Sequence, residues 1–319
     1  MKLLFLGTSA ARPTAERNVS ALVLTRGGET LLFECGEGTQ RQMMRYGVSF
    51  ALSQIFFTHF HADHFLGVIG LIRTLGLQDR TDPLHLYGPG GARKLLGKAV
   101  ELGVERVPFP VEIHEVEAGG RIKGKGYDIE VIPVEHGRGA GAVAFALREH
   151  LRLGRFDPEK ARAMGIPEGP LWGRIHKGET VEYEAEIDGR KVKRTVRPDE
   201  LVGAPRPGRL VVLSGDTRPA QALVEAATNA DLLVHEATFG EEEKERARET
   251  GHSTAVEAAQ VALAARARQL VLTHLSARYS AAGEVLLNEA KMGFPATIVA
   301  RDGLTIDVPF DGESPPSGR

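Results

Sequence analysis

The stretch THFHADH (residues 58–64) places His59, His61, Asp63 and His64 directly after the apolar run QIFF (residues 54–57) and before a helix-like segment. Three imidazoles and one carboxylate within six residues are difficult to explain by packing. If the apolar run is a buried strand, its end delivers these side chains to the carboxyl edge of a sheet, where α/β proteins usually bind ligands. The loop then offers imidazoles at alternate positions to one metal ion, and Asp63 and His64 to a second. A polar surface turn is the alternative interpretation.

Three further strand-like runs also end at a potential metal ligand. IEVIPVEH ends at His136, RLVVLSGD ends at Asp216, and QLVLTH ends at His274. Each placement alone is weak, because a lone histidine at the end of a strand is more often a hydrogen-bonded surface residue. Together with the first loop they predict one shared site of seven ligands. Seven ligands suit two zinc ions, and a pair of ions about 3.5–4 Å apart is the arrangement used for phosphoryl-group hydrolysis.

The composition limits the kind of metal site and the kind of partner. The chain has 319 residues, is 42% hydrophobic and contains one cysteine, Cys35, which excludes an internal disulfide and a thiolate-rich zinc site. Its net charge of −2 means that a nucleic acid would have to be met by a local basic patch. No apolar stretch approaches the roughly 18 residues of a membrane span. We therefore expect a cytoplasmic protein with no membrane partner.

The order of the predicted elements indicates an α/β fold. The runs KLLFLG, SALVLTRG and ETLLFECG near the amino terminus are typical of an opening β-meander. From about residue 65, segments with apolar residues at helical spacing alternate with further strand-like runs. This order predicts sheets covered by helices on the outside.

Residues 148–209 differ from the rest of the chain, being rich in charge, glycine and proline. They hold 14 Lys or Arg and 11 Asp or Glu, so this segment carries +3 and the remaining chain −5. We expect an insertion that projects from a single domain spanning residues 1–319.

The pattern H-x-H-x-D-H with a downstream His, Asp and His resembles the signature of the metallo-β-lactamase superfamily, and the resemblance covers almost the whole chain. It implies an αββα sandwich with two zinc ions. Carried over by position, it implies that one zinc ion is held by His59, His61 and His136, the other by Asp63, His64 and His274, and that Asp216 bridges them.

Because this fold carries many activities, other motifs must indicate the substrate. The segments LGTSAARPTAERNVSA, FECGEGTQRQ, HEATF, GHST and THLSARY together resemble the ribonuclease Z family. The resemblance implies an endoribonuclease that cleaves the 3′ trailer from precursor tRNA, leaving a 3′-hydroxyl on the tRNA and a 5′-phosphate on the trailer. In the working mechanism, Asp63 accepts the proton of the attacking water, and His252, oriented by Glu236, protonates the leaving oxygen.

Two segments are candidates for binding the substrate. Ser253 and Thr254 precede a predicted helix, Thr254 and Glu257 match a capping box, and a helix amino terminus near the site favours bound phosphate. FDPEKARAMGIPEGPLWGRIHKGETV (residues 156–181) resembles the tRNA-gripping arm of the long bacterial enzymes, with Gly169-Pro170 as its Gly-Pro pair. We expect the arm at about residues 152–180, where phosphate contacts can position RNA without reading its bases. The resemblance also implies a homodimer.

This chain departs from the family pattern in two places. Glu34 stands where the family usually has Asp, which leaves the local hydrogen bonding open, and the sequence PRPGR (residues 205–209) matches the family's basic loop only loosely, which leaves open how CCA is discriminated.

Two other functions fit parts of the sequence. The same zinc site could serve a phosphodiesterase that acts on small esters. The other is a metal-bearing protein that binds RNA without cleaving it. Such a protein would lack a metal ligand or the general acid, and this sequence contains all seven ligands and His252.

Overall fold

The computed structural model describes residues 1–311 apart from 105, 138–140, 188–189 and 281–282. The chain divides into two compact units, Met1–Arg148 with Arg209–Arg319, and Glu149–Gly208. No helix among the described residues is both long enough and apolar enough to cross a bilayer.

The larger unit contains two seven-stranded mixed sheets. In spatial order, the first sheet consists of β16 (Thr305–Asp307), β1 (Lys2–Gly7), β2 (Ala21–Arg26), β3 (Glu29–Phe33), β4 (Gln54–Phe56), β5 (Leu84–Gly88) and β6 (Val111–Glu115). The second consists of β15 (Thr297–Val299), β14 (Leu270–Thr273), β13 (Leu232–Glu236), β12 (Leu210–Leu213), β9 (Val143–Glu149), β8 (Tyr127–Pro133) and β7 (Arg121–Gly124). The predicted meander is formed by β1, β2 and β3, which pair antiparallel.

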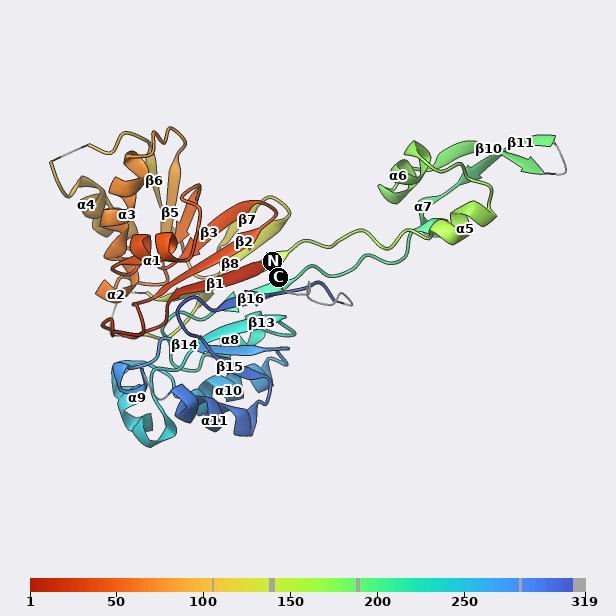
Figure 1. Ribbon diagram of the computed structural model, residues 1–319. Helices are drawn as coiled ribbons and strands as arrows, with labels where there is room; N and C mark the ends of the chain where they lie inside the picture. Colours follow the sequence, from red (N-terminus) through yellow and green to blue (C-terminus); the bar gives the residue numbers. More distant parts are fainter. Residues whose placement is uncertain (105, 138–140, 188–189, 281–282, 312–319) are drawn as a thin grey trace. The chain divides into compact units, whose positions relative to one another are not determined.

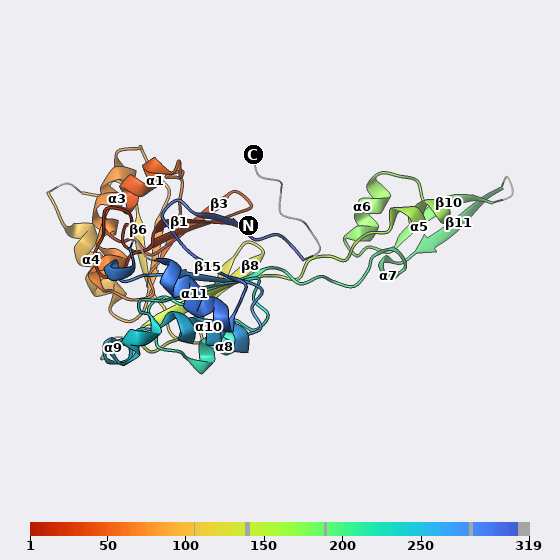
Figure 2. The ribbon, with the colours of Figure 1, turned by 60° about the horizontal axis from the view of Figure 1, so that its bottom comes forward.

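Helices cover the outer face of each sheet (Figure 1). The helices beside the first sheet are α1 (Thr39–Arg45), α2 (Ala62–Phe65), α3 (Gly67–Gly76) and α4 (Ala92–Glu101). Those beside the second are α8 (Gln221–Ala226), α9 (Lys244–Thr250), α10 (Ala255–Ala264) and α11 (Gly283–Gly293), with the 3-10 turns η1 (Glu241–Glu243) and η2 (Ala277–Tyr279). Figure 2 shows α8, α10 and α11 together on their sheet.

Three apolar layers hold this unit together. Phe33, Phe56 and Phe145 belong to the layer between the two sheets. A second layer, containing Leu71, lies between the first sheet and its helices, and an alanine-rich third layer, containing Ala258, lies between the second sheet and its helices. Strands with a helix layer on one face and a sheet on the other are buried on both faces, which explains why their sequences are continuous apolar runs. The predicted αββα sandwich is confirmed.

The smaller unit has its own core. It contains α5 (Pro158–Ala163), α6 (Pro170–His176), the antiparallel hairpin β10 (Val181–Ile187) and β11 (Arg190–Val196), and α7 (Pro198–Leu201). Ala161 and Ile175 from the helices pack with Tyr183 and Val196 of the hairpin. The segment expected to form the arm, about residues 152–180, therefore shares its core with the hairpin that follows it.

The net positive charge predicted for the inserted region is smaller when only the residues of the smaller unit, 149–208, are counted. Residues 149–208 hold 12 Lys or Arg against 11 Asp or Glu, because Arg148 and Arg209 belong to the larger unit. Arg148 forms an ion pair with Glu130 there, and the Arg209 guanidinium lies 3.8 Å from the ring centroid of Phe310. The smaller unit by itself carries only +1.

Candidate metal and catalytic centre

The seven predicted ligands lie at the carboxyl ends of strands or on the turn that follows. His59 and His61 follow β4, and Asp63 and His64 lie on the single-turn helix α2. The other three follow β8, β12 and β14, with His274 in the left-handed backbone region at φ +57°. Because β12 and β14 both run parallel to β13, their carboxyl ends meet at one edge of the second sheet, opposite the end of β4.

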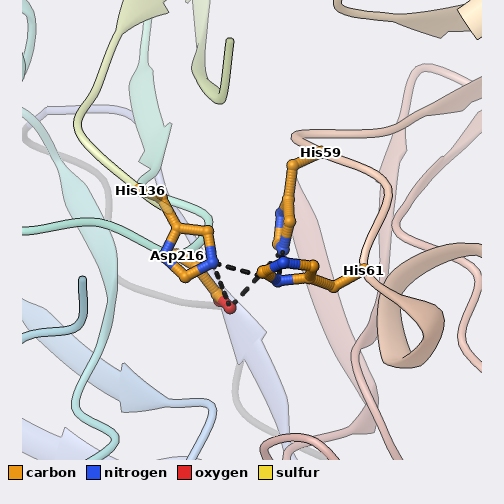
Figure 3. A group of neighbouring side chains, drawn as sticks. All are labelled: His59, His61, His136 and Asp216. Carbon is orange, nitrogen blue, oxygen red and sulfur yellow. Dashed lines mark hydrogen bonds and ion pairs between the residues drawn. The ribbon is translucent and has the colours of Figure 1, made fainter. Parts of the chain in front are cut away.

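One group of ligands comprises His59, His61, His136 and Asp216 (Figure 3). Nδ1 of His61 lies 3.0 Å from Nε2 of His59 and 3.1 Å from Nε2 of His136. Oδ2 of Asp216 lies 3.7 Å from Nε2 of His59 and 3.8 Å from Nε2 of His136. The four side chains point toward one common point.

A second group comprises Asp63, His64 and His274. Nε2 of His64 lies 3.3 Å from Nε2 of His274, and Oδ2 of Asp63 lies 3.2 Å from the latter atom. Oδ2 of Asp216 is 3.3 Å from Nε2 of His64, so the same oxygen borders both groups.

These distances fit the chemistry of zinc. With zinc–nitrogen bonds of about 2.0–2.1 Å, ligand atoms at the corners of a tetrahedron lie about 3.3–3.4 Å apart. Oδ1 of Asp216 is buried and accepts no hydrogen bond. Five imidazoles that face one another across two carboxylates are better satisfied by cations than by shared protons, so the residues present fit a metal centre.

Three of the five histidines have a further partner at Nδ1, and Nδ1 of His274 also lies 3.3 Å from Oδ1 of Asp216. Nδ1 of His136 donates to the carbonyl oxygen of Gly251 at 2.8 Å. Nδ1 of His59 lies 3.0 Å from Oγ1 of Thr58, and Nδ1 of His274 lies 3.0 Å from Oγ1 of Thr238. Such partners set the orientation and basicity of a metal-ligating imidazole.

The buried ligands strongly shift one another's ionisation. Burial and the neighbouring His64 hold the pKa of His59 well below its usual value. Burial opposes ionisation of Asp216, yet His274 and His64 hold the pKa of that carboxyl well below its usual range. Burial also opposes ionisation of Asp63, but hydrogen bonds from His274 and His64 hold its pKa well below the usual range. Both carboxylates are therefore ionised.

A pair beside the ligands, buried Glu236 and the partly exposed His252, is placed to move a proton. Nδ1 of His252 lies 2.8 Å from Oε1 of Glu236, the last residue of β13. Burial alone would lower the pKa of His252, but Glu236 and Asp216 raise it to about 9. Glu236 is held by the backbone N–H groups of Thr217 and Thr238 and by the Thr238 hydroxyl. The imidazole is thus fixed at Nδ1.

Comparison with known proteins assigns the family. A family model described as the anti-Pycsar protein Apyc1 matches residues 1–154, less than half of the chain. A relative from Gemmatimonas aurantiaca named ribonuclease Z is 56% identical over 310 residues, which cover 97% of this chain and 96% of the relative. The chain belongs to the ribonuclease Z family, the endoribonucleases of tRNA 3′ processing. The family predicted from the sequence is confirmed.

Solved structures agree with this assignment. The ribonuclease Z homologue human tRNase Z, short form, is 28% identical to this chain, has a TM-score of 0.69, and the match covers 97% of this chain and 100% of the human one. The metallo-β-lactamase fold protein YhfI from Bacillus subtilis is 19% identical with a TM-score of 0.67, covering 96% of this chain and 98% of YhfI. This second likeness supports the fold alone.

Several contacts of this ribonuclease Z centre are not evident from the sequence. The backbone N–H of Ala11, at φ +59°, donates to Oδ2 of Asp63 at 2.7 Å. Oε1 of Glu34 accepts the N–H of Thr58 at 3.0 Å and lies 3.6 Å from Nδ1 of His64. Glu34 therefore brings a negative charge beside His64 without a hydrogen bond to Nδ1 of that ring. The only sequence signal for these roles was that Ala11 and Glu34 lie in motifs typical of ribonuclease Z.

The four residues predicted to bind substrate lie in two different settings. Ser253 and Thr254 are buried: the Ser253 hydroxyl donates to the carbonyl oxygen of Thr217, and Thr254 forms the predicted capping box of α10 with Glu257. Gly169 and Pro170 are exposed in the smaller unit, where Gly169 has φ +132° and Pro170 begins α6. A substrate contact of any of the four stays a prediction.

A cavity of about 390 Å³ opens onto the centre. Its lining includes Asp63, His252 and three arginines, Arg12, Arg246 and Arg278. Arg278 forms an ion pair with Glu243, so the positive charge that this cavity offers to the phosphates of an RNA chain comes chiefly from Arg12 and Arg246.

Proposed function

We propose that this chain is a two-zinc endoribonuclease that cleaves precursor tRNA at the 3′ trailer, leaving a 3′-hydroxyl on the tRNA and a 5′-phosphate on the trailer. The observation that carries the proposal is the position of Asp216, whose Oδ2 lies 3.3 Å from a nitrogen of one ligand group and 3.7 Å from a nitrogen of the other. A carboxylate between two sets of imidazoles is the arrangement expected of a bridging ligand.

The proposed ligand sets follow the two groups. His59, His61 and His136 would hold one ion, Asp63, His64 and His274 the other, and Asp216 would be shared. When bound, such a pair of ions lowers the pKa of water and stabilises negative charge on phosphoryl oxygens. A donor set of imidazole and carboxylate with no thiolate is typical of catalytic rather than structural zinc.

Asp63 would accept the proton of the attacking water and hold the water in line with the scissile bond. Its carboxylate borders the cavity, and the Ala11 N–H and Nε2 of His274 fix the position of Oδ2. Because these contacts favour the ionised form, the carboxylate would release the proton to solvent water in the cavity that it borders.

His252 would protonate the departing 3′-oxygen. A ribose oxygen is a poor leaving group, so a positioned acid can contribute about 10²–10⁴-fold to the rate. Glu236 fixes Nδ1 of His252, and His252 lines the cavity. Nε2 would therefore be the atom that donates the proton.

We propose that RNA is held in two places. Arg12 and Arg246 on the cavity wall would contact phosphates near the scissile bond. The smaller unit would grip the tRNA body through exposed cations such as Lys193 and Arg194 on β11. Both contacts would position the substrate without reading its bases.

A homodimer and a cytoplasmic location complete the proposal. Both rest on the family resemblance and on a tRNA substrate. Light scattering of the purified protein tests the dimer. We expect a mass close to twice the 34.5 kDa of one chain. A mass of one chain at micromolar concentration would remove that part of the proposal.

The function is tested with zinc-loaded protein and two substrates, a precursor tRNA with a 3′ trailer and bis(p-nitrophenyl) phosphate. We expect one cut in the precursor, with the end groups stated above, and loss of cleavage of both substrates in Asp63→Ala. Hydrolysis of the small ester without cleavage of the precursor would favour the small-ester phosphodiesterase instead.

A further inference from the structure

A second cluster of potential metal ligands lies at the edge of the first sheet. His85 is on β5, and Glu112 and His114 are on β6, the outermost strand of that sheet. Figure 1 shows these two strands side by side. In their parallel register His85 pairs with Glu112 and Tyr87 with His114, so all four side chains project from one face. None of the seven ligands described above belongs to this cluster.

The ligand atoms of this cluster converge. Nδ1 of His85 lies 3.2 Å from Nε2 of His114 and 3.3 Å from Oε2 of Glu112, and Nε2 of His114 lies 3.8 Å from the same oxygen. Two of the three distances match the separation of about 3.3–3.4 Å between the ligand atoms of a tetrahedral zinc ion. One proton on Nδ1 of His85 cannot point at both neighbours, whereas a single cation satisfies all three atoms.

Aromatic packing orients one of the two imidazoles. The ring of His114 stacks on Tyr87 with centroids 4.7 Å apart, and Tyr87 stacks on Phe56 at 5.0 Å. Phe56 in turn stacks on Phe33 at 4.9 Å, and both phenylalanines belong to the core between the sheets. This ladder of rings across β3, β4, β5 and β6 ties the orientation of His114 to the core. Ligands on rigid paired strands lose little conformational freedom when a metal binds.

The cluster is also open to water. The side chains of His85, Glu112 and His114 are 30%, 50% and 39% exposed. A metal held here would have three protein ligands and a fourth position accessible to solvent.

We propose that His85, Glu112 and His114 form a further site for a divalent transition-metal ion, separate from the catalytic centre. Two imidazoles and one carboxylate favour Zn²⁺, Ni²⁺ or Cu²⁺ over Mg²⁺ and Ca²⁺, which prefer all-oxygen ligands. A bound ion would fasten the edge strand β6 to β5. This site stands independently of the proposed function.

The test counts bound zinc. The wild-type protein and the variants His85→Ala and His114→Ala are dialysed against the same micromolar Zn²⁺ buffer, and the metal is measured per chain. We expect the wild type to hold one ion more than either variant, and Glu112→Gln to bind the extra ion at least about tenfold more weakly, because the amide carries no charge. His150→Ala, which removes an exposed histidine of the smaller unit, is the matched control and should keep the full count. Equal counts in the wild type and His114→Ala, or loss of the ion in His150→Ala, would overturn the proposal.

Hydrogen exchange gives a second measurement. Amides of residues 111–115 should exchange more slowly when Zn²⁺ is added to the wild type beyond its tightly bound ions, and should not respond in His114→Ala. Unchanged hydrolysis of bis(p-nitrophenyl) phosphate would show that the variant is folded. Equal slowing in both proteins would place the extra ion elsewhere and contradict the assignment.

Discussion

Nδ1 of His252 lies 2.8 Å from Oε1 of Glu236, and the same carboxylate is held by two backbone N–H groups and one hydroxyl. An imidazole fixed in this way at one nitrogen presents the other to the substrate. Oδ2 of Asp216 lies 3.9 Å from Nδ1 of His252, so this pair is a neighbour of the proposed bridging ligand. The proposed proton donor and the proposed bridging ligand therefore belong to one centre.

His252→Ala should slow precursor tRNA cleavage by about 10²–10⁴-fold while leaving bis(p-nitrophenyl) phosphate hydrolysis within about threefold of wild type. A ribose 3′-oxygen needs a proton when it leaves, whereas p-nitrophenolate does not. Single-turnover rates on both substrates check this prediction. Equal slowing of both would mean that His252 is not the general acid.

Thr238→Val should weaken zinc binding by about 10–100-fold, because Oγ1 of Thr238 contacts both Glu236 and Nδ1 of His274. The measurement is the free zinc concentration that gives half-maximal activity. Thr238→Ser, which keeps the hydroxyl, is the matched control and should stay near wild type. A zinc dependence of Thr238→Val indistinguishable from that of the wild type would show that the hydroxyl does not support His274.

Glu34→Gln should lower zinc affinity without unfolding the protein. The amide oxygen can still accept the Thr58 N–H, but the negative charge near Nδ1 of His64 is lost. We expect a shift of about tenfold in the zinc requirement and little change in the unfolding midpoint of the zinc-saturated protein. If the midpoint falls while the zinc requirement stays constant, Glu34 serves the loop rather than the metal.

The convergence of the seven proposed ligands could be predicted from the sequence because each one follows an apolar run that forms a strand. The same reasoning cannot identify the groups that form hydrogen bonds with these side chains. Ala11 and Asp63 lie 52 residues apart, and His136 and Gly251 lie 115 apart, so only the tertiary fold brings the members of each pair together. Backbone groups such as the Ala11 N–H also have no side-chain signal.

The fold class was evident from the order of strands and helices, but the extent of the insertion's core was not. Tyr183 and Val196 come after the motif that resembles an arm, yet they complete its core. The basic excess assigned to the insertion came largely from Arg148 and Arg209, whose side chains belong to the larger unit. Counting charges along a sequence cannot show on which side of a domain boundary they lie.

Removing the smaller unit should impair precursor tRNA and spare the small ester. Arg148 and Leu210 are partners in the antiparallel pair of β9 and β12, so a short Gly-Ser turn can replace residues 149–208 and leave Arg209 in the larger unit. We expect kcat/KM for precursor tRNA to fall by about two orders of magnitude, because binding energy remote from the scissile bond is lost. Rates on both substrates are compared with wild type. Full processing of the precursor by the shortened chain would refute the gripping role.

Zinc titration of metal-free protein, followed by precursor tRNA cleavage and metal analysis, tests the central claim most directly. The His114→Ala background keeps the surface cluster from contributing. If seven ligands share two ions through Asp216, activity should require the second equivalent of zinc and level off at two ions per chain. Full activity at one tightly bound ion per chain would contradict the two-metal centre.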